Sequence, residues 1–228
     1  MNLYLLVEGK RTEPKLYPEW IKCFIPGIKQ IEDPFLLNTE SFLDNTFYIF
    51  SGLGYPSLLD NHLKNAIADI NKIPRINHFA ICLDSDERSV AQTKEIINNF
   101  ITKHHLSLLH ANLSVIVQDC CIETWLLGNR RIYHRTPTDK ELLECISHYD
   151  VYTHDPELMR EVPPGYNCSQ YHFYYLRQLF QSRNISYTKK NPGHASAAIY
   201  LNELIKRNEE TGHISTFGQF KEFCLSLK

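Results

Sequence analysis

Four short apolar runs, each followed by polar residues, divide the first half of the chain. The runs are LYLLV (3–7), NTFYIF (45–50), HFAICL (78–83) and LSVIVQ (113–118). The segments between them, 12–24, 57–72 and 88–105, carry apolar residues at helical spacing. Strands that alternate with helices are typical of a parallel sheet with helices on its faces. The pattern therefore predicts an α/β core with a parallel, or mostly parallel, sheet over residues 1–120.

The second half of the chain has a different pattern, with helical periodicity and no further strand signal. We expect helices within 121–127, 138–149, 171–183 and 194–208. Between the second and third of these, the segment 153–170 contains Pro and Gly and is predicted to be a loop. Residues 121–228 are therefore expected to form a helical, loop-rich extension packed on the α/β core, either as a second unit or as part of one continuous domain.

Two of the predicted strands end in carboxylates. Glu8 and Gly9 follow the first run, and Asp84 and Asp86 follow the third. In open α/β sheets, ligands bind beyond the carboxyl ends of the strands. If these strands are neighbours, the three carboxylates converge, and crowded carboxylates raise one another's pKa unless a cation neutralises them. Mg²⁺ or Mn²⁺ prefers such oxygen ligands.

The Asp-x-Asp spacing adds to this interpretation, because residues two apart in an extended segment point the same way. A structural alternative exists for the pair. Asp84 and Asp86 precede a helix predicted to begin near Arg88, and Asp is a favoured N-cap residue. Capping leaves Glu8 unexplained, and we therefore favour the metal site.

Composition and charge exclude few classes of function. The 228 residues include 24 Lys and Arg against 26 Asp and Glu. The slightly negative balance disfavours a protein that coats nucleic acid through bulk electrostatics. No apolar run approaches the ~20 residues that span a bilayer, and no signal-peptide pattern is seen. We expect a cytoplasmic protein without a membrane partner.

The seven cysteines are odd in number and scattered, which favours reduced thiols over a disulfide framework. The sequence has no Cys-x-x-Cys pair and no histidine at zinc spacing from a cysteine pair. Adjacent residues point to different sides of a strand or helix. A joint metal site of Cys120 and Cys121 is therefore not expected.

Local basic clusters offer candidate contacts to nucleic-acid phosphates. The candidates are Lys10, Arg11, Arg130, Arg131 and Lys189. Guanidinium groups match phosphate oxygens well, which favours the arginine pair after the 121–127 segment. Ordinary solvated surface charge is the alternative for each cluster taken singly.

The motifs that carry the carboxylates resemble a known family. VEGKRTE followed by LDSDE resembles the Toprim domain, which topoisomerases, bacterial-type primases, recombination-repair proteins and OLD (overcoming lysogenization defect) nucleases share. VEGKRTEPKLYPEWI together with CIETWLL is similar to the RloB-like branch of small Toprim proteins, which is associated with bacterial defence loci. The resemblance covers the first half of the chain and the beginning of the second, up to about residue 130.

The resemblance implies roles for individual residues. Glu8 corresponds to the Toprim glutamate, a metal ligand or general acid/base, and Asp84 and Asp86 correspond to the metal-binding pair. The resemblance also makes Glu123 a candidate site residue. The residue before it is Ile122, where the RloB-like branch usually has Phe. Because apolar residues surround Glu123 in the sequence, its carboxyl group must be paired, protonated or metal-bound if buried. An exposed position on a helix is the alternative.

Two further residues are candidates. Glu13 is a second carboxylate from the first motif, although interaction with a helix dipole explains it equally well. Lys190 is a candidate catalytic cation for the scissile phosphate, since OLD nucleases use a lysine outside the first motifs. No local motif identifies the lysine, and solvent exposure is the alternative for Lys190.

Together these observations predict a Toprim-type nuclease that uses Mg²⁺ or Mn²⁺ to cleave phosphodiester bonds in DNA or RNA, tRNA included. The resemblance implies an effector of anti-phage defence and leaves room for a partner ATPase. Two alternatives stay open. One is a metal-dependent phosphohydrolase of a small nucleotide, and the other is a catalytically silent Toprim-like interaction or sensor module.

Overall fold

A five-stranded parallel sheet forms the centre of the molecule. The computed structural model describes residues 1–38 and 44–228. The strands are β1 (Asn2–Val7), β2 (Lys29–Ile31), β3 (Thr46–Ser51), β4 (His78–Asp84) and β5 (Asn112–Gln118), and they lie in the order β2-β3-β1-β4-β5. All strand pairs are parallel. The predicted α/β fold class with a parallel sheet is confirmed, and the short edge strand β2 is the one that periodicity did not predict.

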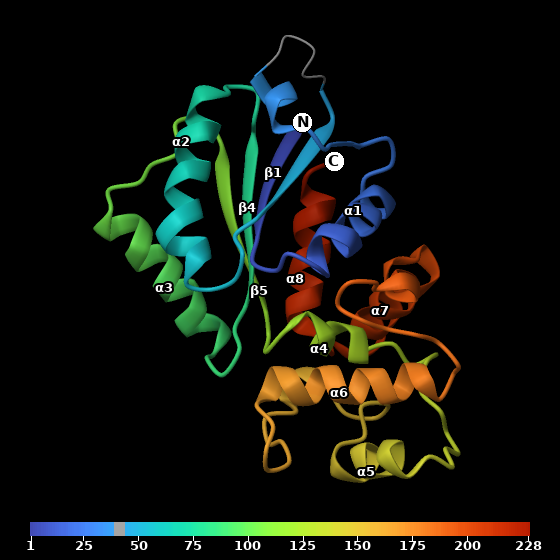
Figure 1. The fold of residues 1–228 in the computed structure, drawn as a ribbon. Helices are drawn as coiled ribbons and strands as arrows, with labels where there is room; N and C mark the ends of the chain where they lie inside the picture. Colours follow the sequence, from blue (N-terminus) through green and yellow to red (C-terminus); the bar gives the residue numbers. More distant parts are fainter. Residues whose placement is uncertain (39–43) are drawn as a thin grey trace.

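Helices cover both faces of this sheet (Figure 1). On one face lie α2 (Lys64–Lys72), which continues the π-helical segment η2 (Leu58–Leu63), and α3 (Val90–Lys103). On the other face lie α1 (Glu13–Phe24) and α8 (Ser215–Ser226). The predicted helices after β1, β3 and β4 are therefore confirmed.

The central strand β1 is buried on both faces, which explains its nearly continuous apolar sequence. Leu3, Leu5 and Val7 join the core beneath α1 and α8, whereas Tyr4 and Leu6 join the core beneath α2 and α3. Side chains alternate between the faces of a strand, so each face of β1 needs its own apolar set.

The rest of the chain packs beyond the carboxyl ends of the strands (Figure 1). Its helices are α4 (Ile122–Leu127), α5 (Lys140–His148), α6 (Cys168–Gln181) and α7 (Ala198–Thr211), and its short 3₁₀ turns are η3 (Pro156–Leu158) and η4 (Gly193–Ser196). A further 3₁₀ turn, η1 (Pro34–Asn38), follows β2. The four predicted helices of the extension are confirmed, with α6 beginning earlier than its apolar periodicity indicated. The predicted loop contains the turn η3.

The last helix, α8, was not predicted, and it fills a face of the sheet. It packs against β5 and α1. Phe220 on α8 is fully buried, stacks 4.8 Å from Tyr17 on α1 and lies 5.7 Å from Trp125 on α4, ring centroid to ring centroid. The end of the chain thus shares one apolar cluster with its beginning, from Leu3 to Leu227.

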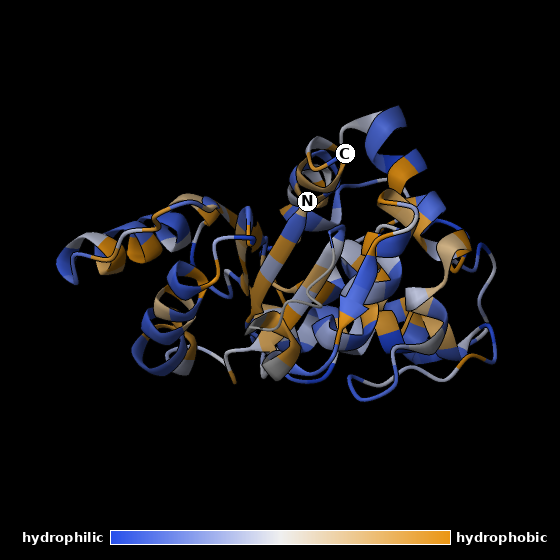
Figure 2. Ribbon diagram, turned by 90° about the horizontal axis from the view of Figure 1, so that it is seen from above, coloured by the Kyte–Doolittle hydropathy of each residue, from blue (hydrophilic) through white to orange (hydrophobic). Residues whose placement is uncertain are grey.

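The hydropathy of the helices agrees with this layered packing. Figure 2 shows hydrophobic and hydrophilic positions alternating along the helices, as expected where one helix face contacts the core. Within the described parts of the chain, no helix is long and apolar enough to cross a membrane.

We predict that Phe220→Ala destabilises the protein strongly, because it removes a fully buried ring that joins α8, α1 and α4. Large-to-small changes of this kind cost about 3–5 kcal/mol of unfolding free energy. Leu225→Ala on the same helix is the matched control, since Leu225 is 38% exposed and a surface change costs less than about 1 kcal/mol. Urea unfolding measures both, and equal losses would contradict a core role for α8.

Candidate functional site

Glu8 lies at the carboxyl end of β1, directly beside the end of β4. The register pairs Val7 with Cys82, and the Glu8 amide donates to the Cys82 carbonyl at 2.9 Å. The Glu8 carboxylate accepts hydrogen bonds from the backbone amides of Asp84 (Oε2, 3.1 Å) and Tyr55 (Oε1, 3.1 Å). The two strands are neighbours, which was the condition for the carboxylates to converge, and this pairing fixes Glu8 against Asp84.

Gly9 allows a second carboxylate to approach the same strand end. The Gly9 amide donates to Oε1 of Glu13 at 3.1 Å, and Glu13 is only 4% exposed. A Cβ atom on Gly9 would lie 2.1 Å from Glu13 Oε2, closer than any van der Waals contact. Because Glu13 is buried, its carboxylate cannot easily move away. Glu8 therefore places one carboxylate at the end of β1, and Gly9 leaves room beside it for the carboxylate of Glu13.

Glu123 enters the site from the first turn of α4. Its side chain is fully buried, and its Oε1 accepts a hydrogen bond from the Tyr187 hydroxyl at 3.3 Å. Its Oε2 lies 3.6 Å from the Lys189 ammonium. The structure thus places Glu123 in the buried, paired arrangement that its apolar neighbours required, not in the exposed alternative.

A cavity of about 400 Å³ opens where these groups meet. It is lined by Glu8, Gly9, Lys10, Arg11, Thr12, Glu13, Leu53, Gly54, Asp84, Ile122 and Lys189. Oδ1 of Asp84 is buried and has no hydrogen-bond partner among the described residues. A buried, unpaired carboxylate oxygen is costly, and it is a natural ligand for a cation.

The electrostatics of the site show an excess of negative charge. Burial raises the pKa of Asp84 well above its usual range, and the nearby Cys121 thiol and the carboxyl groups of Glu13, Glu8 and Glu123 raise it further. Burial also raises the pKa of Glu13, and that of Glu123 to about 8, against the attraction of Lys189. For Glu8, burial raises the pKa although two amide donors oppose it. Four carboxyl groups thus lie close to the partly exposed ammonium of Lys189.

The lysine at this centre is Lys189. Burial lowers its pKa, but the carboxylates, Glu123 foremost, outweigh burial and raise it overall. The candidate catalytic residue Lys190 is exposed, and its carbonyl accepts from the ammonium of Lys15 outside the cavity. Lys189, predicted from the sequence only as a phosphate contact, is therefore the better-placed lysine.

Asp86 does not join Asp84 in the way that its spacing suggested. The backbone turns after β4, and Asp86 adopts φ +50°, so the two residues are not in an extended segment. Asp86 Oδ1 accepts from the Ser169 hydroxyl on α6 at 3.0 Å. It does contribute to raising the pKa of Glu8. The structure thus places Asp86 at the edge of the site.

The capping alternative for the two aspartates is wrong. The helix after them, α3, has Ser89 as its N-cap, and a reciprocal pair of hydrogen bonds with Gln92 completes a capping box. The aspartates are free for another role.

The predicted phosphate contacts fall into two places. Lys10 and Arg11 line the acidic cavity. Arg130 and Arg131 line a separate cavity of about 580 Å³ together with further basic groups, namely Arg135, Arg183, Lys206 and Arg207. Glu210 and Glu203 lie 3.8 and 3.7 Å from Arg130 and Arg131, respectively, so the acidic groups offset this basic surface only in part.

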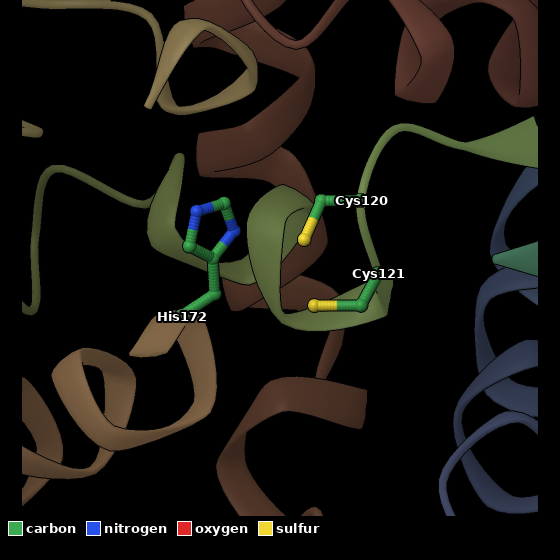
Figure 3. Close-up of side chains that lie close together, drawn as sticks. All are labelled: Cys120, Cys121 and His172. Atoms are coloured by element: carbon green, nitrogen blue, oxygen red, sulfur yellow. The ribbon is translucent and has the colours of Figure 1, made fainter. Parts of the chain in front are cut away.

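The expectation that Cys120 and Cys121 face different sides is wrong. Cys120 has φ +62°, in the left-handed region, and this turn brings both thiols to the same side. Their sulfur atoms and a ring nitrogen of His172 all lie within 4.8 Å of one another (Figure 3). The missed signal was Cys168-x-x-x-His172, a spacing that places both side chains on one face of α6.

Comparison with known proteins adds no family. No family model, no curated protein and no solved structure matches this chain. The assignment of function therefore rests on the site itself and on the motif resemblance.

The raised pKa of Glu123 predicts that the protein without Mg²⁺ or Mn²⁺ loses stability as the pH rises. The folded state holds the Glu123 proton up to about pH 8, whereas an unfolded Glu releases it near about pH 4.3. Between these two pKa values the folded state binds more protons than the unfolded state. The stability that Glu123 contributes is therefore complete below the unfolded pKa and is lost as the pH rises to about 8.

Glu123→Gln is expected to remove a large part of that loss, since the amide does not titrate. Glu19→Gln, on the exposed face of α1, is the control and is expected to follow the wild type. Urea unfolding at about pH 5, 6, 7 and 8 measures the effect. A Glu123→Gln protein with the full pH dependence of the wild type would show that Glu123 does not hold its proton in the folded state.

Proposed function

We propose that the protein is a divalent-metal-dependent nuclease that hydrolyses phosphodiester bonds, with Mg²⁺ or Mn²⁺ as its metal. The observation that carries the proposal is the convergence of Glu8, Glu13 and Asp84 on one cavity, where a buried oxygen of Asp84 has no hydrogen-bond partner among the described residues. Glu123 lies behind the cavity wall, paired with Lys189. The donor set is made of carboxylate oxygens, which suits a hard cation.

Glu8 and Asp84 are the residues that would hold the metal, with Glu123 and Glu13 beside them. Each oxygen of Glu8 accepts one backbone amide and keeps a second lone pair for a ligand. Asp84 supplies an oxygen without any hydrogen-bond partner among the described residues. A bound metal would supply activation of water and stabilisation of the negative charge that develops on phosphate.

The chain's own basic groups are suited to bind the phosphate. Lys189 reaches the cavity with a raised pKa, so its ammonium stays protonated at neutral pH. Lys10 and Arg11 line the same cavity. These cations hold the phosphate in place and offset its charge, while the carboxylates keep one side of the site available for the metal.

The second, basic cavity supports a polymeric substrate over a small nucleotide. Arg130 and Arg131 directly follow α4, the helix that carries Glu123. Basic groups at both the acidic cavity and the second cavity favour a nucleic-acid backbone that extends past the cleaved bond. DNA and RNA, tRNA included, both carry this backbone. Defence against phage and control by a partner ATPase are proposed on the motif resemblance alone.

We predict that Glu8→Gln and Asp84→Asn each reduce cleavage by at least about 100-fold, the scale of losing one charged group of a catalytic site. Binding to nucleic acid in Ca²⁺ is expected to persist, because Arg130 and Arg131 are unchanged. Purified protein is assayed on plasmid, single-stranded DNA and total tRNA with Mg²⁺ or Mn²⁺. Asp69→Asn, on the exposed side of α2, is the matched control and is expected to retain wild-type activity.

The same assay separates the alternatives. Full activity in both variants would overturn the proposed site. A wild type that cleaves none of these substrates but hydrolyses nucleotides would favour the phosphohydrolase. A wild type that is inactive and shows no Mn²⁺-induced rise in melting temperature would favour the silent module, since a ligand of the folded state stabilises it.

A further inference from the structure

A second group of metal-ligating side chains lies next to the acidic cavity, and none of its members lines that cavity. Cys120, Cys121, Cys168 and His172 are each at most 2% exposed. Cys120, Cys121 and His172 bring their ligand atoms within 4.8 Å of one another (Figure 3), and Cys168 Sγ lies 3.4 Å from Nε2 of His172. The three thiols also form one buried cluster, so three sulfurs and one imidazole share a single enclosed place.

The fold brings these four residues together from two elements. Cys120 and Cys121 connect β5 to α4, and the left-handed backbone of Cys120 turns the neighbouring thiols inward. Cys168 and His172 lie one turn apart at the start of α6, and α6 packs against α4. A non-glycine residue with positive φ is uncommon and persists where surrounding interactions favour it.

We propose that these four residues form a structural zinc site, with Zn²⁺ bound by three cysteine sulfurs and one imidazole nitrogen. A closed set of four S and N ligands is typical of structural Zn²⁺. Mg²⁺ and Mn²⁺ prefer oxygen, so this site and the acidic cavity select different metals. The proposal goes beyond the proposed nuclease and does not depend on it.

The surroundings of His172 fit a zinc ligand. Nδ1 lies 2.7 Å from the Thr124 hydroxyl, and Nε2 lies 3.0 Å from the Met159 carbonyl. If one ring nitrogen binds the metal, the N–H of the other ring nitrogen can donate a hydrogen bond to one of these oxygens. Such a hydrogen bond orients the imidazole of zinc-ligating histidines. The guanidinium of Arg160, paired with Asp119, is close enough to interact electrostatically with Cys168 and Cys120, and it offsets the negative charge of a three-thiolate site.

The site would hold the extension against the sheet next to the acidic cavity. The Cys120 amide donates to the Ser85 hydroxyl at 2.8 Å, directly after Asp84. On the other side, the Cys168 amide donates to Glu87 at 2.9 Å. Zinc would therefore fix α6 and the start of α4 relative to the turn that follows β4. Its role is structural, because no ligand position is left for a substrate.

A disulfide is the competing use of these thiols. All seven cysteines are free in the structure, and a bridge between two members of the cluster would leave one sulfur and His172 without a shared ligand. Zinc uses all four groups at once. The two states differ in metal content and in the number of reactive thiols, so one experiment separates them.

The test begins with full-length protein expressed in zinc-supplemented medium and purified without chelator. Elemental analysis is expected to give one equivalent of zinc per chain. A mercurial thiol reagent is expected to release it, with a fall in melting temperature. After excess dithiothreitol has removed the mercurial and has itself been removed, added Zn²⁺, but not Mg²⁺ or Mn²⁺, is expected to restore the melting temperature. Cys168→Ser and His172→Asn are expected to lose most of the zinc, and Cys23→Ser, which alters an exposed thiol, is expected to keep it.

A second measurement uses the wild type alone and does not depend on the folding of variants. Co²⁺ exchanged into the chain is expected to give the intense visible bands of tetrahedral Co²⁺ and thiolate-to-metal charge transfer. Protein that contains no zinc and gives no such bands would overturn the proposal. So would a disulfide within the cluster found by peptide mapping of freshly purified protein, or zinc retained in full by Cys168→Ser.

Discussion

The parallel pairing of β1 with β4 is the constraint on which the candidate site depends. This pairing sets Val7 opposite Cys82. Glu8, directly after β1, and Asp84, the last residue of β4, therefore meet at one edge of the sheet. The hydrogen bond from the Asp84 amide to the Glu8 carboxylate follows from this register. A shift of β1 by one residue would turn Glu8 and the apolar side chains of β1 to the wrong faces.

Burial then gives these carboxylates their chemistry. The extension packs beyond the strand ends, and α4 adds Glu123, whose fully buried carboxylate lies 3.6 Å from the ammonium of Lys189 in the cavity wall. Glu8, Asp84, Glu123 and Glu13 thus lie in surroundings that disfavour charged groups. The ammonium of Lys189 balances only part of their negative charge. A protein that keeps several such groups together loses stability unless they bind a proton or a cation. The arrangement is one that a divalent metal would relieve.

The fold could be predicted from the sequence to a large extent, because strands buried on both faces and amphipathic helices leave clear patterns. The sequence patterns did not predict two elements, one because it is too short and one because its neighbours in the fold bury several of its sides. The edge strand β2 has three residues, too few for periodicity. The helix α8 is apolar on several sides because it packs against the sheet, α1 and α7.

The candidate site could be predicted in part. Strand-end position identified Glu8 and Asp84, and the motif resemblance identified Glu123. The role of Asp86 was inferred from spacing, which failed because the backbone turns at this residue. Lys189 and the cysteine cluster depend on contacts between segments far apart in the sequence. The local spacing of Cys168 and His172 marks one half of the cluster and does not show what it meets. His172, for example, meets Cys121 only because α6 packs on α4.

The central claim is that the acidic cavity binds a hard divalent cation through Glu8 and Asp84. Crystals grown with Mn²⁺ and measured with anomalous scattering at the manganese edge test it most directly. The account predicts an anomalous peak in contact with Asp84 Oδ1 and the Glu8 carboxylate, and no such peak in crystals of Asp84→Asn. Wild-type crystals at saturating Mn²⁺ with no anomalous density in this cavity would contradict it.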